Sequence, residues 1–248
     1  IFTEYIIRRK KELNQLKGGE YTVKTIVTTE LIKDIAEKNH IICYDVYTGF
    51  KWIADIIRKE GGEKFIGGGE ESFGYMPGAF TRDKDGVSAT SLMAEIAAWV
   101  KMQNKTLYSF LKEIYAKYGF SQERMIYIVR KGLSGAQEIK AMMEEFRHNT
   151  PKEINHSPVV LKKDYLSLEA TNLQTGEKTH LDFETKSDVL QFFLADGSKI
   201  SVRPSGTEPK IKFYFEARTQ MKDINDYERA QQEANARIDA IIEYLKIQ

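Results

Sequence analysis

Apolar positions in the first half of the chain recur at two different spacings. Short runs that alternate apolar and polar residues, or that are apolar throughout, predict strands, whereas apolar residues three or four positions apart predict amphipathic helices. Because strands and helices alternate, we expect a three-layer α/β domain with a parallel or mixed sheet over residues 1–120. The expected strands cover residues 21–27, 41–47 and 64–66, and the expected helices cover residues 2–16, 30–39, 49–59, 87–103 and 106–118.

The second half differs, because strand-like segments dominate it. We expect an α+β domain over residues 121–248, in which an antiparallel sheet is backed by helices. Ser134 and Gln137 have the spacing of a capping box, which would start a helix at this point. The expected strands cover residues 125–129, 159–168, 188–194, 199–202 and 211–215, and the expected helices cover residues 134–146 and 226 onward.

The charge balance and the cysteine content narrow the class of protein. Lys and Arg number 37 against 36 Asp and Glu, so neither a nucleic acid nor a membrane surface is an expected partner. Cys43 is the single cysteine, which excludes an internal disulfide and fits a reducing, cytoplasmic location. No apolar run reaches the roughly 18 residues needed to span a bilayer. The chain starts inside a predicted helix and without Met, so we expect it to be a piece of a longer protein.

Two of the predicted strands flank a turn that has the chemistry of an anion site. The turn reads Arg-Pro-Ser-Gly-Thr-Glu-Pro-Lys over residues 203–210. A glycine frees backbone N–H groups, hydroxyl groups donate further hydrogen bonds, and a guanidinium binds two oxygens of a phosphate at once. Pro, Ser, Gly and Thr are also ordinary turn residues, so a long hairpin without a ligand is the alternative.

A second candidate site follows the strand at residues 41–47. Thr48 is expected to cap the helix that contains Gly49 and Lys51. Helix N-termini attract anions, so this end of the helix could contact a phosphate. The alternative is an ordinary N-cap followed by an exposed lysine.

Three glycines, Gly67–Gly69, follow the next strand and are expected to form a tight turn. Glu70 and Ser72 come directly after them and offer an acceptor and a donor for sugar hydroxyls. The alternative is a flexible glycine loop with solvated glutamates. Further along, Lys84 stands between two aspartates before a predicted helix, as an ammonium group held at a polar cleft would.

Four motifs now stand in a fixed order: Thr-Gly-Phe-Lys at residues 48–51, Gly-Glu-Glu-Ser-Phe-Gly at residues 69–74, Asp-Lys-Asp-Gly at residues 83–86 and the turn at residues 203–210. Together they resemble the third and fourth domains of the α-D-phosphohexomutases, the phosphoglucomutase/phosphomannomutase family, over nearly the whole chain. The runs around Phe73 and Lys84 are most similar to the branch of bacterial phosphoglucomutases and phosphopentomutase-like enzymes. The resemblance implies an α/β third domain followed by a TBP-like α+β fourth domain.

Within the first domain, the resemblance implies roles for five residues. Glu70 and Ser72 match the pair that grips the ring hydroxyls of the sugar. Lys84 matches an active-site lysine that faces the reacting phosphate. Gly49 and Lys51 match the loop associated with discrimination between sugars.

Within the second domain, the resemblance implies a site for the substrate's non-reacting phosphate. Lys212 matches a second cation near that phosphate, and Lys210 is the alternative for this role. The residues that match the phosphate-binding loop itself are Arg203, Ser205, Gly206 and Thr207.

The resemblance also implies a reaction. In the family, a phosphoserine transfers its phosphoryl group to a sugar phosphate, the sugar bisphosphate turns round, and Mg²⁺ is held by a three-aspartate loop. This sequence contains neither the phosphoserine loop nor the metal loop. We therefore expect no metal site in this chain, no activity without the N-terminal domains, and a parent enzyme that interconverts the 1- and 6-phosphates of glucose or mannose.

Three alternatives to this interpretation remain at the level of the sequence. The parent protein could act on pentose phosphates. The chain could be a non-catalytic module that binds phosphosugars, or an unrelated α/β enzyme.

Overall fold

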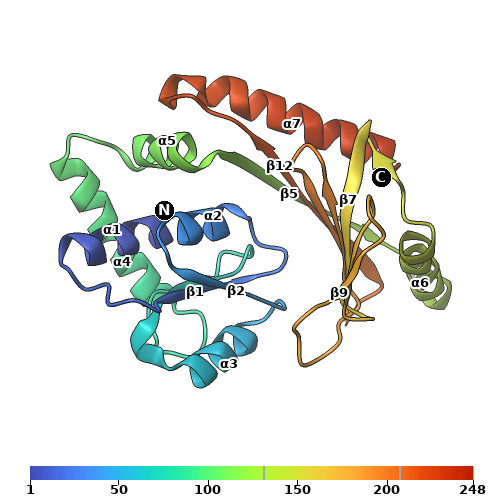
Figure 1. Ribbon diagram of the computed structural model, residues 1–248, viewed down its shortest axis with the longest axis horizontal. Coiled ribbons are helices and arrows are strands. Elements are labelled where there is room, and N and C mark those ends of the chain that lie inside the picture. Colours follow the sequence, from blue (N-terminus) through green and yellow to red (C-terminus); the bar gives the residue numbers. More distant parts are fainter. Residues whose placement is uncertain (131, 207, 248) are drawn as a thin grey trace. The chain divides into compact units, whose positions relative to one another are not determined.

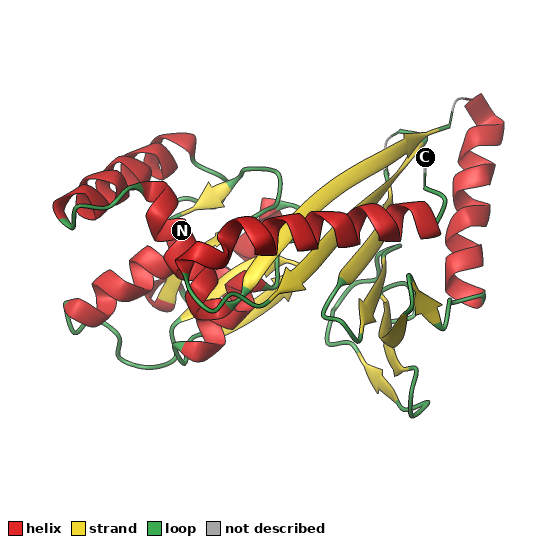
Figure 2. Cartoon of the chain, turned by 90° about the horizontal axis from the view of Figure 1, so that it is seen from above, coloured by secondary structure: helices red, strands yellow, loops and turns green. Residues whose placement is uncertain are grey.

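The computed structural model describes residues 1–130, 132–206 and 208–247, which form two compact units. The first unit comprises Ile1–Phe120 together with Gln220–Tyr227, and the second comprises Ser121–Thr219 together with Glu228–Gln248. Helices and strands alternate along the first unit, whereas strands outnumber helices in the second (Figures 1 and 2). Each unit has its own sheet and is described separately.

The sheet of the first unit is mixed, with three parallel strands and one short antiparallel strand. Its order is β2 (Ile42–Val46), β1 (Tyr21–Thr25), β3 (Phe65–Gly69) and β4 (Tyr75–Met76). β1 is parallel to both β2 and β3, and β4 is antiparallel to β3. The helices are α1 (Phe2–Glu12), α2 (Leu31–Lys38), α3 (Phe50–Glu60), α4 (Gly86–Met102) and α5 (Leu107–Tyr118), with short 3₁₀ helices at Gly62–Lys64 and Ile224–Asp226.

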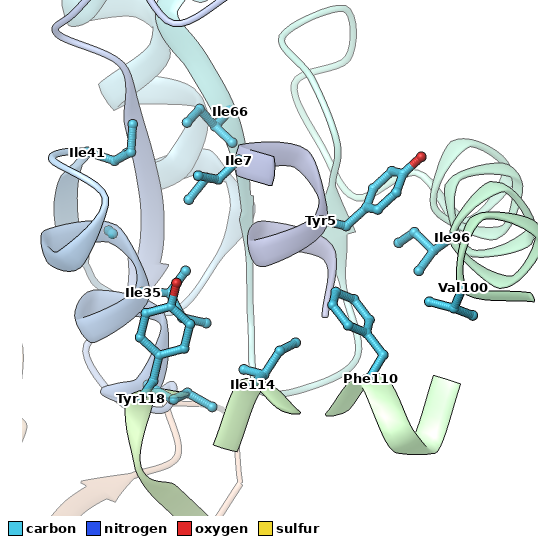
Figure 3. Packing of buried hydrophobic residues seen from close by; sticks show 12 residues of the cluster. Tyr5, Ile7, Ile35, Ile41, Ile66, Ile96, Val100, Phe110, Ile114 and Tyr118 are labelled. Atoms are coloured by element: carbon cyan, nitrogen blue, oxygen red, sulfur yellow. The ribbon is translucent and has the colours of Figure 1, made fainter. Parts of the chain in front are cut away.

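Two clusters of buried apolar residues lie on opposite faces of this sheet and make the unit three-layered, as the sequence predicted. On one face, Ile53 and Ile57 of α3 pack with Val23 and Phe65 of the sheet. On the other face, Ile66 of β3 packs with residues of the remaining helices (Figure 3). That second cluster includes Ile7 of α1, Ile35 of α2, Ile96 of α4 and Phe110 and Ile114 of α5.

The three consecutive glycines lie inside β3 and not in a turn, so the prediction of a tight turn at Gly67–Gly69 is wrong. All three are buried and pair with β1. A Cβ at Gly68 would lie 2.8 Å from the carbonyl oxygen of Val23 and 3.2 Å from Ile53. Glycine is therefore required here because α3 and the neighbouring strand leave no room for a side chain.

The second unit is an antiparallel sheet backed by helices, which confirms the predicted α+β class. The helices α6 (Gly132–His148) and α7 (Tyr227–Tyr244) cover it, and Arg124 of β5 donates a hydrogen bond of 3.0 Å to Asn235 of α7 (Figure 1). The strand order is β5 (Phe120–Val129), β12 (Lys210–Thr219), β11 (Lys199–Pro204), β10 (Leu190–Leu194), β7 (Ser157–Asp164), β8 (Glu169–Asn172) and β9 (Lys178–His180), and β6 (Glu153–Ile154) pairs with β7.

Two local predictions for this unit are wrong. The strand expected at residues 159–168 ends at Asp164, and a turn with Leu168 at φ 60° leads into the unpredicted hairpin of β8 and β9. That turn contains no glycine or proline, and Tyr165 within it is buried, so the sequence reads as a continuing strand. Ser134 is not an N-cap, because α6 already begins at Gly132 and Ser134 lies inside it. Gly135, in the same turn, has no room for a Cβ, because the backbone of Arg130 lies against it.

Within the part of the chain that the structure describes, no helix is both long enough and apolar enough to cross a membrane.

Candidate functional site

The ends of β2 and β3 bring three of the predicted site residues together. Ligands bind beyond the carboxyl ends of the strands in sheets of this kind. Glu70 follows β3 directly, and its carboxylate accepts a hydrogen bond from the backbone N–H of Gly49, which lies after β2. The hydroxyl of Ser72 lies 3.4 Å from the second oxygen of the same carboxylate. Gly49, Glu70 and Ser72 therefore form one cluster.

Gly49 holds a backbone conformation that favours glycine and takes the position predicted for Thr48. It is the N-cap of α3, with φ 118° and ψ 125°, so the prediction that Thr48 caps this helix is wrong. The carboxylate of Glu70, which comes from the next strand, accepts the N–H at this point instead. A negative charge at the start of a helix is stabilised by the helix dipole.

Lys84 reaches the start of α3 from the loop before α4. Its Nζ lies 5.6 Å from the centre of the Phe50 ring and 3.3 Å from a carboxylate oxygen of Asp83. The backbone and side-chain hydrogen bonds from Lys84 hold the pKa of the Asp83 carboxyl below its usual value. The side chain of Lys84 is 65% exposed, so its ammonium group is accessible to an anion.

Lys51, two residues after Gly49, forms no ion pair with Glu70 within the described residues. Its Nζ lies 4.8 Å from the centre of the Trp52 ring, and the residue lines an open depression of about 390 Å³ beside α3. The other lining residues of this depression are Ala54, Asp55, Arg58 and Arg82.

Sequence reasoning missed two polar residues next to the Glu70 cluster. Glu71 accepts a hydrogen bond of 3.1 Å from the hydroxyl of Thr25 at the end of β1. Lys24, also on β1, is completely buried and forms ion pairs with Asp45 and Glu30. A lysine within an otherwise strand-like apolar segment was the available signal for the second residue.

In the second unit, two predicted cations stand directly opposite each other. Arg203 of β11 pairs with Lys212 of β12 in the antiparallel register, so that their side chains share one face of the sheet. Like charges in this relationship destabilise a sheet. Within the described residues, no carboxylate forms an ion pair with either of them. By contrast, Lys199 and Glu216, further along the same two strands, form a buried ion pair of 3.1 Å.

The turn between these two strands is closed by its own backbone. The N–H of Ser205 donates to the carbonyl of Lys210 over 2.8 Å. The carboxylate of Glu208 pairs with Lys210, and the pKa of Glu208 is held below its usual value by Lys210 and, less strongly, by Lys212. Gly206 is exposed, does not have a left-handed φ, and has no neighbouring atom within 4 Å of an added Cβ. Thr207, predicted as a phosphate ligand, lies outside the described residues.

A cavity of about 180 Å³ separates this turn from α6. Ile139 and Met143 of α6 form its apolar side, and Ser205 and Lys210 border it from the turn. These two residues of the turn therefore face open space on the side of α6.

The described residues do not fit a magnesium site. Nowhere among them do three or more His, Cys, Asp or Glu side chains gather as metal ligands would. The two glutamates nearest the candidate sugar site, Glu70 and Glu71, are each engaged by hydrogen-bond donors of the protein. We therefore assign no chemical step to a metal bound by this chain.

Comparisons with known proteins match two parts of the chain to two domains of one family. Residues 1–118 match the family model described as phosphoglucomutase/phosphomannomutase, alpha/beta/alpha domain III. Residues 138–240 match the model for the C-terminal domain of the same family. Phosphoglucomutase of Staphylococcus aureus strain MRSA252 is 35% identical over 231 residues, which cover 93% of this chain and 40% of the relative. Phosphoglucomutase of the bovine strain RF122 is 36% identical over 207 residues, which cover 83% of this chain and 37% of the relative.

Solved structures share the fold. Parafusin (pp63), a phosphoglucomutase of Paramecium in its open form, aligns with 98% of this chain and 40% of its own length, with a TM-score of 0.64 and 19% identity. A phosphoglucomutase/phosphomannomutase family protein of Burkholderia thailandensis aligns with 94% of this chain and 42% of its own, with a TM-score of 0.50 and 14% identity. The chain thus spans about 40% of the length of the relatives that it matches.

Proposed function

Because the chain belongs to the phosphoglucomutase/phosphomannomutase family and carries its domain III and its C-terminal domain, we propose that it is the substrate-binding part of a phosphohexomutase. The parent protein interconverts the 1- and 6-phosphates of a hexose. Glucose is the proposed sugar, because the curated relatives described above are named phosphoglucomutases. The proposed domains are residues 1–120 for the sugar and residues 121–248 for the phosphate.

The opposed cations on β11 and β12 carry this proposal. Arg203 and Lys212 face each other across the two strands, and their repulsion is relieved when an anion lies between or above them. A phosphate suits this arrangement because a guanidinium donates two parallel hydrogen bonds to phosphate oxygens, while the ammonium group adds a point charge. The adjoining turn contributes Ser205, Gly206, Thr207 and Lys210 to the same phosphate.

The absence of a structural demand for glycine at position 206 supports the same site. Gly206 needs neither a left-handed backbone nor space inside the protein, because no atom lies within 4 Å of an added Cβ. A glycine without such a demand is suited to a backbone that a ligand approaches closely. We assign that close approach to a phosphate oxygen.

The first unit supplies the contacts with the sugar. Glu70 and Ser72 alternate an acceptor with a donor, which suits neighbouring hydroxyl groups of a sugar ring. Gly49 fixes the orientation of Glu70, and Lys84 offers an accessible cation for the reacting phosphate. Lys51 lies next to this loop and takes part in discrimination between sugars.

Phosphoryl exchange belongs to the part of the parent protein outside this chain. We assign to that part the phosphoserine that gives and regains the phosphoryl group and the Mg²⁺ that neutralises charge on the transferred group. A sugar bisphosphate forms after the first transfer and turns round before the second. The chain alone is therefore proposed to be inactive. We also propose a cytoplasmic location, because Cys43 is a free cysteine, as is usual in a reducing compartment.

The test is a coupled mutase assay on the full-length parent protein, with Mg²⁺ and a trace of sugar bisphosphate. Glucose, mannose and ribose 1-phosphates are compared as substrates. We expect turnover of glucose 1-phosphate that is lost on Arg203→Ala and on Glu70→Ala. A folded parent that binds these sugar phosphates but turns over none of them would replace the enzyme with a binding module. Preferred turnover of ribose 1-phosphate would correct the sugar.

A further inference from the structure

Two adjacent carboxylates after β3 extend to different parts of the first unit. Glu70 accepts its hydrogen bond from Gly49 at the start of α3. Glu71 accepts from the hydroxyl of Thr25 over 3.1 Å, and the hydroxyl of Thr28 lies 3.4 Å from the same oxygen. The turn that follows β3 is thus tied to α3 by one carboxylate and to the end of β1 by the next.

The two threonines form a short hydrogen-bonded chain that ends on Glu71. Their hydroxyl oxygens lie 2.8 Å apart, and both residues are buried, with Thr25 completely covered. Each hydroxyl has one proton, so the distances favour donation from Thr28 to Thr25 and from Thr25 to the carboxylate. Moving Glu71 away would leave a buried hydroxyl without its acceptor, which costs stability. The hydrogen bonds of the two threonines therefore hold Glu71 in place.

The residue that precedes Thr25 on β1 is also held by its partners. The ammonium group of Lys24 lies 2.7 Å from Asp45 of β2 and 3.0 Å from Glu30 at the start of α2. Its side chain is completely buried, and the two carboxylates raise its pKa despite the opposing effect of burial. Because a buried charge that loses its partner is strongly destabilising, these ion pairs hold the end of β1 that carries Thr25 against β2 and α2.

The loop itself needs such a support. Residues 70–74 form the loop between β3 and β4. A backbone hydrogen bond of 3.0 Å from the Glu70 N–H to the Gly74 carbonyl closes this loop. Phe73 within it is fully exposed and holds a left-handed φ of 64°. A bulky residue keeps this conformation only where its surroundings impose it.

We propose that Glu71 is a positioning residue, which holds the loop so that Glu70 and Ser72 face the hydroxyls of the sugar. Glu71 itself does not touch the substrate. Its removal lets the loop shift, which weakens the sugar contacts of Glu70 while leaving the phosphoryl transfer groups intact. This inference rests on the proposed function of the same site.

The test compares Glu71→Ala, Glu71→Gln, Thr25→Val and the double variant Glu71→Ala/Thr25→Val in the full-length parent protein. Glu71→Ala and Thr25→Val are each expected to raise KM for the sugar phosphate about tenfold, with kcat within about twofold. The double variant should show no more than the larger single effect, because both changes break one connection. Glu71→Gln, whose amide oxygen still accepts from Thr25, should retain most of the affinity. Glu63→Ala, on the exposed 3₁₀ helix, is the control and should leave KM unchanged.

Three results would overturn the inference. They are an unchanged KM in Glu71→Ala, KM effects that multiply in the double variant, or a fall in the kcat of Glu71→Ala as large as the rise in its KM. Thermal melting of each variant shows whether it is folded, and a variant with a lowered melting midpoint is measured below that midpoint. If the unmodified protein turns over no sugar phosphate, the proposed function fails instead. Turnover by the unmodified protein with no KM change in the variants rejects only the role of Glu71.

Discussion

The backbone N–H of Gly49 donates a hydrogen bond to the carboxylate of Glu70 and so joins the loop after β2 to the loop after β3. These are the two loops that resemble the sugar-discriminating and sugar-gripping segments of phosphohexomutases. Their connection depends on the backbone conformation of one residue, because Gly49 holds φ 118° at the N-cap of α3. A change at Gly49 is therefore expected to reach the sugar site through Glu70.

Gly49→Ala is expected to lower the free energy of unfolding by about 1–3 kcal/mol, the usual cost of a strained backbone. An added Cβ has room, with its nearest neighbour 3.7 Å away in Trp52, so the cost arises from the backbone conformation. Binding of glucose 1-phosphate to the full-length protein should weaken as well, which titration calorimetry measures. Gly61→Ala, at the other end of α3 with φ 84° and free space, is the matched control. It should lose similar stability and keep its affinity; equal weakening of binding would reject the coupling.

Lys212→Gln is expected to separate stability from phosphate binding. Removal of one of two opposed cations relieves repulsion with Arg203, so the free energy of unfolding should rise by about 0.2–1 kcal/mol. Affinity for glucose 1-phosphate should fall at the same time, because the phosphate loses a charge partner. Urea denaturation and calorimetry measure the two effects. Unchanged affinity together with raised stability would show that Lys212 does not bind the phosphate and that Arg203 and Lys210 do.

Gly206→Ala tests whether a phosphate approaches the turn closely. The free energy of unfolding should stay within about 0.5 kcal/mol, because no neighbouring atom lies within 4 Å of the new Cβ and φ is not left-handed. Affinity for a sugar phosphate should fall, since the methyl group occupies the space of a phosphate oxygen. Calorimetric titration with glucose 1-phosphate and with glucose alone distinguishes a loss at the phosphate from a loss at the sugar. Full retention of affinity would contradict the assignment of Gly206.

The periodic elements of both units could be predicted from the sequence, because buried strands and amphipathic helices leave regular apolar patterns. The strands at residues 41–47 and 188–194 and the helices at residues 87–103 and 106–118 lie where those patterns placed them, within a few residues. The site residues came from motif order, not from such patterns. Glu70 and Ser72 were found in this way, and the structure brings them together.

What the sequence left out depends on contacts between segments that are distant along the chain. Three glycines predict a turn when they are considered alone, yet close neighbours leave no room for side chains inside β3. Gly68 lies against Val23 and Ile53, and Gly67 and Gly69 lie against Tyr75. Glu71 was assigned no role, because its partners, Thr25 and Thr28, lie more than forty positions earlier. The turn at residues 165–168 has apolar residues instead of glycine, so no local signal marked the hairpin that follows it.

Gly68→Ala is expected to destabilise the first unit by about 1–3 kcal/mol, the usual cost of overpacking. The added Cβ would lie 2.8 Å from the carbonyl oxygen of Val23, which belongs to the neighbouring strand and cannot move aside alone. Gly86→Ala, at the start of α4 with open space around it, is the matched control and should lose no stability. Urea denaturation followed by circular dichroism measures both. An equal stability of the two variants would mean that β3 has more space than its contacts indicate.

The thiol of Cys43 provides a test of burial that depends on pH. The pKa of this thiol is raised to about 12, chiefly by burial and to a smaller extent by Asp45 and Glu30, against the opposing effect of Lys24 and Lys33. In the unfolded chain the thiol ionises near its ordinary pKa of about 8.5. Between these two values the unfolded state binds fewer protons than the folded state, so the free energy of unfolding falls as pH rises. Tyrosines of the unfolded chain also ionise as the pH approaches 10, but they are the same in both proteins, so a comparison from about pH 8.5 to 10 isolates the thiol. In this range, Cys43→Ala should show a smaller loss of stability with pH than the unmodified chain.

Native Cys43 should also react slowly with iodoacetamide at pH 8 and quickly in urea, since the thiolate is the reactive form. Equal pH dependence of the two proteins, together with rapid alkylation of the native thiol, would show that Cys43 is open to water and that β2 is less covered by α2 than its contacts imply.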